Sequence, residues 1–381
     1  MRARLLLLLA LTACDCGPTS PADAGATDGA RDGTAADSGS SDGAPPQPCR
    51  TALPVDMLWV IDNSNSMAEE QASLAANFPA LIETLTHPPD ADDDGEPDYP
   101  PLTDLRVGIV STDMGVGDTA GVIGCPSGSG DDGVMISRSR AGGACASVGT
   151  EGPPWLQFDG TNGDAFEADF ACLSALGTNG CGLEQQLEAS LAALTRHAAP
   201  GGPHEGFLRP DSLVAVVYVT DEDDCSAADD AIFDPSPAAA DRLGHLRVRC
   251  ALHPELLHPV SRYIRALRNL QLDRRGDVIV AAVTGVPRDL TRDPADIDYD
   301  ALLADERMQY TLDPLDDTRL VPACDLGGVG SAPPARRLVE VVADFAADGD
   351  GLVASICQPD LRPVMEDLAQ LVAARLCVGP D

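Results

Sequence analysis

The sequence predicts an α/β fold in which a parallel sheet is covered by helices on both faces. Nearly continuous apolar runs, typical of buried strands, recur at 55–61, 105–110, 213–219, 278–283 and 352–356. Segments with helically spaced apolar residues lie between these runs. Strands that alternate with helices favour a parallel sheet, because each parallel connection has to cross over the sheet.

The helices are predicted from apolar stripes. Leucine, phenylalanine and isoleucine share one face over 74–85, and similar stripes occur over 183–194, 256–270 and 364–376. Two long stretches lack such periodicity, and we expect them to be loop insertions stapled by disulfides. They are 115–180, which is rich in Gly, Ser and Cys, and 288–335, which is rich in Asp and Pro.

The first residues resemble an export signal. Arg2 and Arg4 precede a short apolar run, and small residues lie directly before Cys14. With that cysteine the segment resembles a bacterial lipobox, which implies a signal peptide at 1–13 and a lipid on Cys14. An ordinary signal peptide with a chance cysteine is the alternative. The run is much shorter than the ~20 residues that a spanning helix needs. We therefore expect a lipid-anchored envelope protein, periplasmic or exposed at the surface.

Composition divides the remainder into a tether and one domain. Residues 15–48 contain no aliphatic side chain larger than alanine, so 14–48 is predicted to be a disordered acidic tether and 49–381 a folded domain. The formal net charge is −36, which argues against nucleic acid as a partner, because phosphate binding needs a basic surface. All 25 basic residues are arginine, so no lysine is available for Schiff-base or phosphate chemistry.

The cysteines are typical of an oxidising compartment. The chain has 12, of which Cys14 and Cys16 lie at the start of the tether. Pairing sequence neighbours predicts Cys125–Cys145, Cys172–Cys181, Cys225–Cys250 and Cys324–Cys357, with Cys49 bonded to Cys377. A zinc site is the competing interpretation, but the sequence has no close CxxC and no HExxH motif.

The first predicted strand is followed by a group of oxygen donors. Asp62, Ser64 and Ser66 form a D-x-S-x-S loop directly after residue 61. In open α/β sheets, ligands bind beyond the carboxyl ends of the strands. Hard oxygen donors suit Mg²⁺ or a similar cation. Ser66 and Glu69 also fit a helix capping box, which needs no metal.

At this loop the chain resembles the von Willebrand factor A family and its metal-ion-dependent adhesion site. The resemblance implies a doubly wound fold, a threonine ligand on a second loop and an aspartate ligand after the fourth strand. Thr178 and Asp221 are the matching positions in this sequence. The family usually has glycine after that aspartate, whereas Glu222 follows here, which makes the local field more negative and admits Ca²⁺ or Mn²⁺ besides Mg²⁺.

A second acidic cluster precedes the second strand. Asp90, Asp92 and Asp94 alternate before Gly95, and Asp98 follows, which resembles the front of a calcium-binding loop. The bidentate glutamate of such loops is missing, since position 101 is proline. The sequence fits a Ca²⁺ site and a solvated acidic loop equally well at this cluster.

The resemblance implies binding rather than catalysis. In that family a metal keeps one open coordination position, which a carboxylate of a protein partner completes. We therefore expect metal-dependent adhesion or protein–protein contact and no enzymatic activity. The alternatives are a structural envelope protein with a non-functional metal site and a metal-dependent hydrolase. The hydrolase is disfavoured by the absence of lysine and of a G-x-S-x-G nucleophile motif.

Overall fold

A computed structural model describes residues 52–90, 93, 95–125, 127–140, 145, 152–272, 277–327 and 330–376. All of them belong to one unit of the chain, residues 48–381. The predicted signal peptide, the lipid site at Cys14, the tether and the predicted Cys49–Cys377 bond lie outside the described residues.

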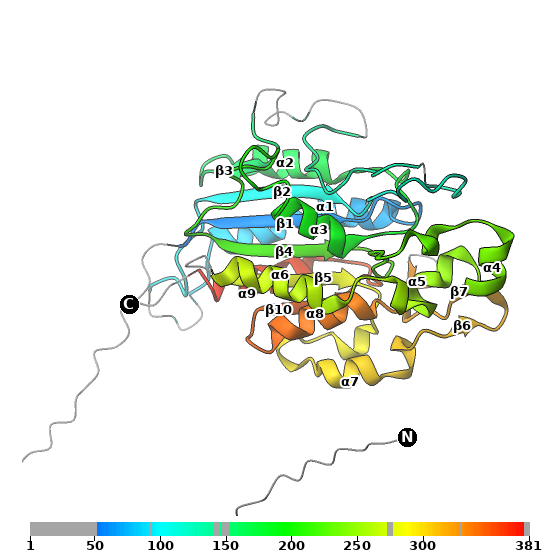
Figure 1. The fold of residues 1–381 in the computed structure, drawn as a ribbon. Helices are drawn as coiled ribbons and strands as arrows, with labels where there is room; N and C mark the ends of the chain where they lie inside the picture. Colours follow the sequence, from blue (N-terminus) through cyan, green and yellow to red (C-terminus); the bar gives the residue numbers. More distant parts are fainter. Residues whose placement is uncertain are drawn as a thin grey trace, which may run out of the picture. The chain divides into compact units, whose positions relative to one another are not determined.

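A six-stranded, mostly parallel sheet forms the centre of this unit (Figure 1). Its strands are β1 (Val55–Ile61), β2 (Leu105–Ser111), β3 (Leu156–Phe158), β4 (Leu213–Val219), β5 (Val278–Thr284) and β10 (Gly351–Ser355). They lie in the order β10-β5-β4-β1-β2-β3, and β3 alone among these six runs antiparallel to its neighbour. The five predicted strands are therefore confirmed. Every residue of β1, β4 and β5 is buried, as expected for strands covered on both faces.

Helices cover both faces of the sheet (Figure 1). On one face lie α1 (Ala68–Thr86), α2 (Gly163–Ser174) and α9 (Arg362–Ala373); α1 packs against both α2 and α9, and all three share an apolar core with β1 side chains. On the other lie α3 (Gln186–Leu194), α6 (Val260–Leu272) and α8 (Arg336–Ala346). The predicted α/β class with both faces covered is confirmed.

The predicted insertions contain more regular structure than their composition indicates. The stretch 115–180 contributes β3, which pairs with β2, and α2, which packs on α1. A stacked pair of rings, Phe78 of α1 and Phe170 of α2, holds this helix, with Trp59 of β1 at their edges. The prediction that all of 115–180 is an irregular insertion is therefore wrong at its carboxyl-terminal end.

Smaller elements project from the sheet. The segment after β4 forms α4 (Pro237–Leu243), the 3₁₀ turn Leu246–Val248 and α5 (Arg249–Leu252). The stretch 288–335 forms α7 (Tyr299–Ala304), the hairpin β6 (Leu312–Asp313) and β7 (Asp316–Leu320), and the pair β8 (Cys324–Asp325) and β9 (Ser331–Ala332). Strand β7 contacts the turn Leu246–Val248, so the two segments lie together beside the sheet (Figure 1).

Within the described part of the chain, four disulfides tie these segments down. Cys225–Cys250 and Cys324–Cys357 are present as predicted. The other two predicted pairs are wrong, because the bonds are Cys125–Cys181 and Cys145–Cys172. Closing a loop of 56 instead of 20 residues costs only about 1 kcal/mol more in chain entropy, so tertiary contacts easily override a preference for the nearest cysteine. Cys125 is thereby joined to the loop that follows Thr178.

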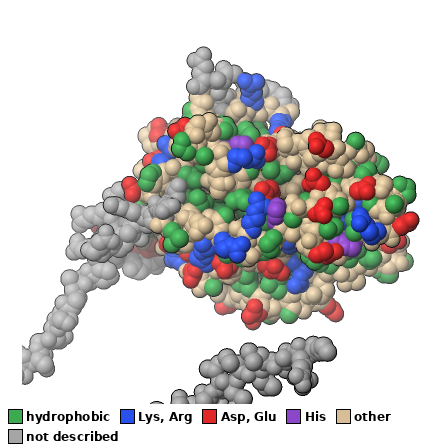
Figure 2. Space-filling model, in the orientation of Figure 1, with side chains coloured by type: hydrophobic (Ala, Val, Ile, Leu, Met, Phe, Trp, Pro, Cys, Tyr) green, Lys and Arg blue, Asp and Glu red, His purple; other side chains and the backbone are tan. Residues whose placement is uncertain are grey.

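The described helices include none with the length and apolar character to span a bilayer. Figure 2 shows acidic side chains scattered over one face of the molecule, with arginines among them rather than in a separate patch.

Candidate metal centre

The predicted ligands lie at the point where the order of strands reverses. From β1 the chain proceeds through β2 and β3 towards one edge of the sheet, and from β4 through β5 and β10 towards the other. Ile61 pairs with Val219, so the carboxyl ends of β1 and β4 are adjacent. A crevice at such a switch point is the usual ligand position of an open α/β sheet.

Asp62 lies at this switch point, between the loop 62–66 and the loop 220–222, and we call this position the crevice. Its side chain is fully buried. The Thr220 hydroxyl donates to Asp62 Oδ2 at 2.6 Å, and the Ser64 N–H donates to Oδ1 at 2.7 Å. Gln186 Nε2 donates in turn to the Thr220 hydroxyl at 3.0 Å, which fixes that group in place. Burial raises the pKa of Asp62, and the hydrogen bonds from Thr220 and Ser64 lower it.

The two serines of the loop face each other. Ser64 Oγ and Ser66 Oγ are 3.3 Å apart. Helix α1 has Met67 at its N-cap and no side-chain capping bond, so Ser66 does not form the predicted capping box. The Ser66 hydroxyl instead lies close enough to the Asp221 carboxylate to lower its pKa. The serine pair thus spans the space between the β1 loop and the β4 loop.

Asp221 is a buried carboxylate with an unsatisfied oxygen. Its exposed fraction is 6 %, and Oδ1 has no hydrogen-bond partner among the described residues. Burial and the negative charges of Asp62 and Glu70 raise the pKa of Asp221 to about 7, against the opposing effect of Ser66. A buried acceptor without a donor is costly, and a cation offsets that cost.

Two further carboxylates, which the sequence analysis did not identify as site residues, surround this position. Glu184, three residues after Cys181, is buried, and burial together with the charges of Asp62, Glu222 and Asp221 raises its pKa well above the usual range. The pKa of the half-buried Glu222 is raised in the same way by burial, Asp221 and Asp62, with Arg247 opposing. Four carboxyl groups therefore repel one another in one crevice.

The loop that carries Thr178 lies beside the D-x-S-x-S loop. Gln71 of α1 donates to the carbonyls of Asp62 and Gly177, at 2.8 and 3.0 Å, and accepts from the Gly177 N–H. The Gly180 N–H donates to the Asn63 carbonyl at 2.8 Å. Thr178 is half-buried and makes no hydrogen bond with a described residue. Helix α3 begins at Gln186, later than the predicted start near Leu183, which leaves room for Glu184 in the crevice.

A third strand end adds a hydroxyl that the sequence analysis missed. Thr112 follows β2 directly, and its hydroxyl is near enough to Asp62 to lower the pKa of that carboxyl. It is buried and makes no hydrogen bond of good geometry within the described part of the chain. Its position could have been inferred from β2, because β2 and β1 end side by side in the register Ile61–Ser111.

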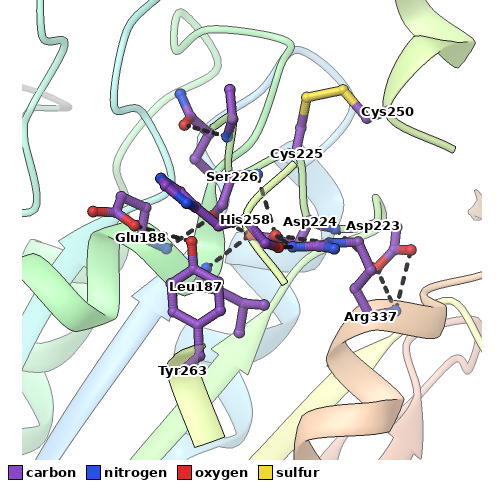
Figure 3. Close-up of polar contacts among 12 residues, drawn as sticks. Leu187, Glu188, Asp223, Asp224, Cys225, Ser226, Cys250, His258, Tyr263 and Arg337 are labelled. Atoms are coloured by element: carbon purple, nitrogen blue, oxygen red, sulfur yellow. Dashed lines mark hydrogen bonds and ion pairs between the residues drawn. A yellow bond between two sulfur atoms is a disulfide. The ribbon is translucent and has the colours of Figure 1, made fainter. Parts of the chain in front are cut away.

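The loop after Asp221 is anchored at its far end (Figure 3). Asp224 is fully buried and accepts hydrogen bonds from Ser226, from the Leu187 N–H at the start of α3 and from the Arg337 guanidinium. Asp223 accepts from the Arg337 N–H at the start of α8 and from Tyr310. The loop thus caps two helix N-termini. This anchoring holds the loop without the glycine that the resemblance led us to expect.

The donor set is one of mixed oxygens. No group of three or more His, Cys, Asp or Glu side chains in the described ranges is arranged to hold a metal ion by itself. The crevice instead combines two aspartates, Asp62 and Asp221, with the hydroxyls of Ser64 and Ser66. Carboxylates with hydroxyls suit a hard divalent cation, and water completes the shell of such ions. These residues therefore fit Mg²⁺, Ca²⁺ or Mn²⁺ better than zinc.

The Ca²⁺ site predicted in the acidic cluster at residues 90–98 stays a prediction. Asp92 and Asp94 lie outside the described residues. Asp90 accepts from the Gly95 N–H at 3.0 Å, and the Asp98 N–H donates to the Pro89 carbonyl. Both contacts close the loop between residues 89 and 98, with or without an ion.

No protein-family model and no curated protein matches this chain. Among solved structures it is similar to the human COPII-coat protein Sec24c, with a TM-score of 0.34 and 10% identity over 85% of this chain and 32% of that one. It is also similar to the pilus adhesin RrgA from Streptococcus pneumoniae, with a TM-score of 0.22 and 15% identity over 47% of this chain and 22% of that one. The chain thus spans at most a third of either protein, and likeness of this degree carries no argument about function.

Proposed function

We propose that this protein is an extracytoplasmic binding module of the von Willebrand factor A type. A divalent cation held by Asp62, Ser64, Ser66 and Asp221 would bind a carboxylate of a protein partner. The observation that carries the proposal is the unpartnered, buried Oδ1 of Asp221, which lies across the crevice from the serine pair. In the native chain this oxygen needs a positive ligand or a donor.

Electrostatics favour a cation at this place. Burial raises the pKa values of all four carboxyl groups, and the charges of Asp62 and Asp221 raise those of Glu184 and Glu222 further, so the crevice strongly resists full ionisation. A divalent ion relieves this repulsion and leaves the crevice attractive to one more anionic oxygen. When bound, the ion would supply an open coordination position for a partner carboxylate. That allows a chain of net charge −36 to hold an acidic ligand.

The chain's own residues prepare the site. Thr220 and the Ser64 N–H orient the two oxygens of Asp62. Gln71 joins the β1 loop to the Thr178 loop, which would place Thr178 as a further ligand, directly or through water. Binding rather than catalysis is proposed, because these contacts position acceptors for a cation and provide no nucleophile paired with a base.

The compartment is proposed from the cysteines and the first residues of the chain. The described residues contain four disulfides, which is typical of oxidising surroundings. We propose that a lipid on Cys14 anchors the protein in the cell envelope and that the tether carries the domain away from the membrane.

Metal-dependent stability tests the site. Mg²⁺ at 100 times its Kd is expected to raise the free energy of unfolding by about 2.7 kcal/mol, because it binds the native state alone. Asp62→Asn, which keeps the size of the side chain, should remove this stabilisation. Asp118→Asn is the matched control, since Asp118 is exposed and lies outside the crevice. Equal stabilisation of Asp62→Asn and wild type by Mg²⁺ would reject the proposal.

A further inference from the structure

A groove of about 810 Å³ opens beside the candidate metal centre. Asn65 of the D-x-S-x-S loop and Thr178 form one wall. The opposite side is built from chain segments outside the central sheet: Ile123 of the first insertion, and His245, Leu246 and Arg247 of the segment after β4. The Cys125–Cys181 and Cys225–Cys250 bonds fasten these segments next to the crevice.

The groove differs in charge from the rest of the molecule. Its lining includes no aspartate or glutamate, although the chain has 61 acidic residues. It does include exposed His245 and Arg247, and Arg247 makes no ion pair or side-chain hydrogen bond with a described residue. Arg249, which also lines the groove, is committed to backbone carbonyls. The Arg247 charge acts on Glu222 at the crevice, but its guanidinium N–H groups donate to no described residue and are available to a ligand.

The groove also carries exposed apolar surface. Ile123 is 96 % exposed, although isoleucine is usually buried, and Leu246 beside it is half-buried. Covering an isoleucine side chain on binding contributes on the order of 1.5–3 kcal/mol. An apolar contact next to a free arginine and a cation site is a combination that fits a peptide better than a small anion.

We propose that this groove binds an extended acidic segment of a protein partner. One acidic side chain of the segment reaches the cation at Asp62 and Asp221, a second pairs with Arg247, and an apolar side chain covers Ile123. The inference rests on the proposed function, because the cation fixes the first carboxylate. Arginine suits the second one, since its planar guanidinium can bind a carboxylate with two parallel hydrogen bonds.

Defined peptides test the inference on the full chain. The probes are fluorescein-labelled Gly/Ser nonapeptides with two aspartates, separated by two to six residues, and the same peptides with either aspartate replaced by asparagine. In saturating Mg²⁺ one spacing should bind roughly fivefold tighter than its single-aspartate forms, the size of one partly exposed ion pair. Arg247→Gln should abolish that advantage. The matched control is Arg242→Gln, which removes an exposed arginine of α4 outside the groove lining and should preserve it.

A parallel titration of each variant with Mg²⁺ by calorimetry separates the two proposals. Absent Mg²⁺ binding rejects the metal site itself. Normal Mg²⁺ binding with no benefit from a second aspartate, or with a benefit that survives Arg247→Gln, overturns the groove inference alone. The groove inference is also overturned if a second copy of this chain fills the groove. That outcome would appear as a dimer that the Ile123→Ser substitution dissociates. Peptide binding that appears only after removal of residues 14–48 would assign the groove to this chain's own acidic segment. That result would also overturn the inference that the groove binds a partner protein.

Discussion

Asp221 and Asp224 lie three residues apart on the loop after β4, and their exposed fractions are 6 % and 0 %. Their surroundings nevertheless differ. The Asp224 carboxylate is surrounded by donors, among them the guanidinium of Arg337 at 3.0 Å. Asp221 faces other carboxylates, and its Oδ1 meets no donor within the described structure. One short loop thus contains a buried charge that is satisfied and one that is not.

The difference shows what each carboxylate does. A buried carboxylate with a guanidinium and helix N–H groups around it has all its partners within the chain, so its role is to hold α3, α8 and the loop together. A buried carboxylate with one oxygen that meets no donor raises the energy of the native state unless a ligand binds that oxygen. Asp224 holds the loop after β4 in place, and the loop in turn positions the Asp221 carboxylate for a ligand.

Loss of Asp224, which holds the loop in place, should have the largest effect on the free energy of unfolding. Asp224→Ala leaves the guanidinium of Arg337 buried without its carboxylate, and we expect it to lower the free energy of unfolding by about 3–5 kcal/mol. Urea unfolding in metal-free buffer measures this. Asp221→Ala, at the same depth in the same loop, should cost far less or even stabilise the protein. Equal losses of stability in Asp224→Ala and Asp221→Ala would contradict the different roles given to these two residues.

Thr220 directly precedes Asp221 and binds Asp62, and its loss should have the next largest effect on the free energy of unfolding. Thr220→Val keeps the shape but removes the hydroxyl that binds Asp62 Oδ2 and accepts from Gln186 and from the Glu222 N–H. A loss of about 1–3 kcal/mol is expected from the buried groups left unpaired. Mg²⁺ affinity should fall too, because Asp62 is no longer oriented. Thr220→Ser retains the hydroxyl and should behave nearly as wild type in both measurements.

Removal of the unsatisfied charge should have a smaller effect, visible as a pH dependence. The pKa of Asp221 is raised from 3.8 to about 7 in the folded chain, so the folded state binds more protons between these values. Its contribution to stability is therefore full below pH 4 and is lost as the pH rises towards 7. Asp221→Asn cannot ionise, and at pH 8 without metal it should exceed wild type by about 1–2 kcal/mol.

Thermal unfolding of both proteins in EDTA from pH 4 to 8 checks this. The two curves should coincide near pH 4 and separate as the pH rises, and Mg²⁺ should restore wild type alone. A gap that is constant over the whole range would show that Asp221 does not titrate in it.

The sequence was sufficient for the parts of the fold that are buried on both faces. Strands β1, β4 and β5 are continuous apolar runs, and Asp62 and Asp221 follow two of them, so the place of both could be predicted. Strand β3 has three residues and carries no such signal. Helix α8 was not predicted, although Leu338, Val342 and Phe345 recur with helical spacing.

The remainder of the site depends on contacts that no local pattern encodes. Glu184 lies three residues after Cys181, whose bond to Cys125 spans 56 residues and was predicted wrongly. Asp223 and Asp224 follow Glu222 in the sequence, and nothing in the local pattern identifies their partners. Their partners Tyr310 and Arg337 come from more than 80 residues away, with separations of 87 and 113. Long-range pairing of this kind is set by the whole fold.

The smallest expected effect concerns Thr178, and it decides how many loops hold the cation. Thr178→Val keeps the shape of a half-buried side chain, so stability without metal should change by no more than about 0.5 kcal/mol. If its hydroxyl is a ligand, Mg²⁺ affinity measured by calorimetry should fall severalfold, and Thr178→Ser should recover it. Gly180→Ala offers a stronger perturbation at the contact between the two loops, because a Cβ there would lie 2.2 Å from Asn63 Oδ1 and the Asn63 amide or the loop would have to shift. Unchanged Mg²⁺ affinity in both Thr178→Val and Gly180→Ala would confine the site to the β1 and β4 loops, with Asp221 as its sole distal ligand.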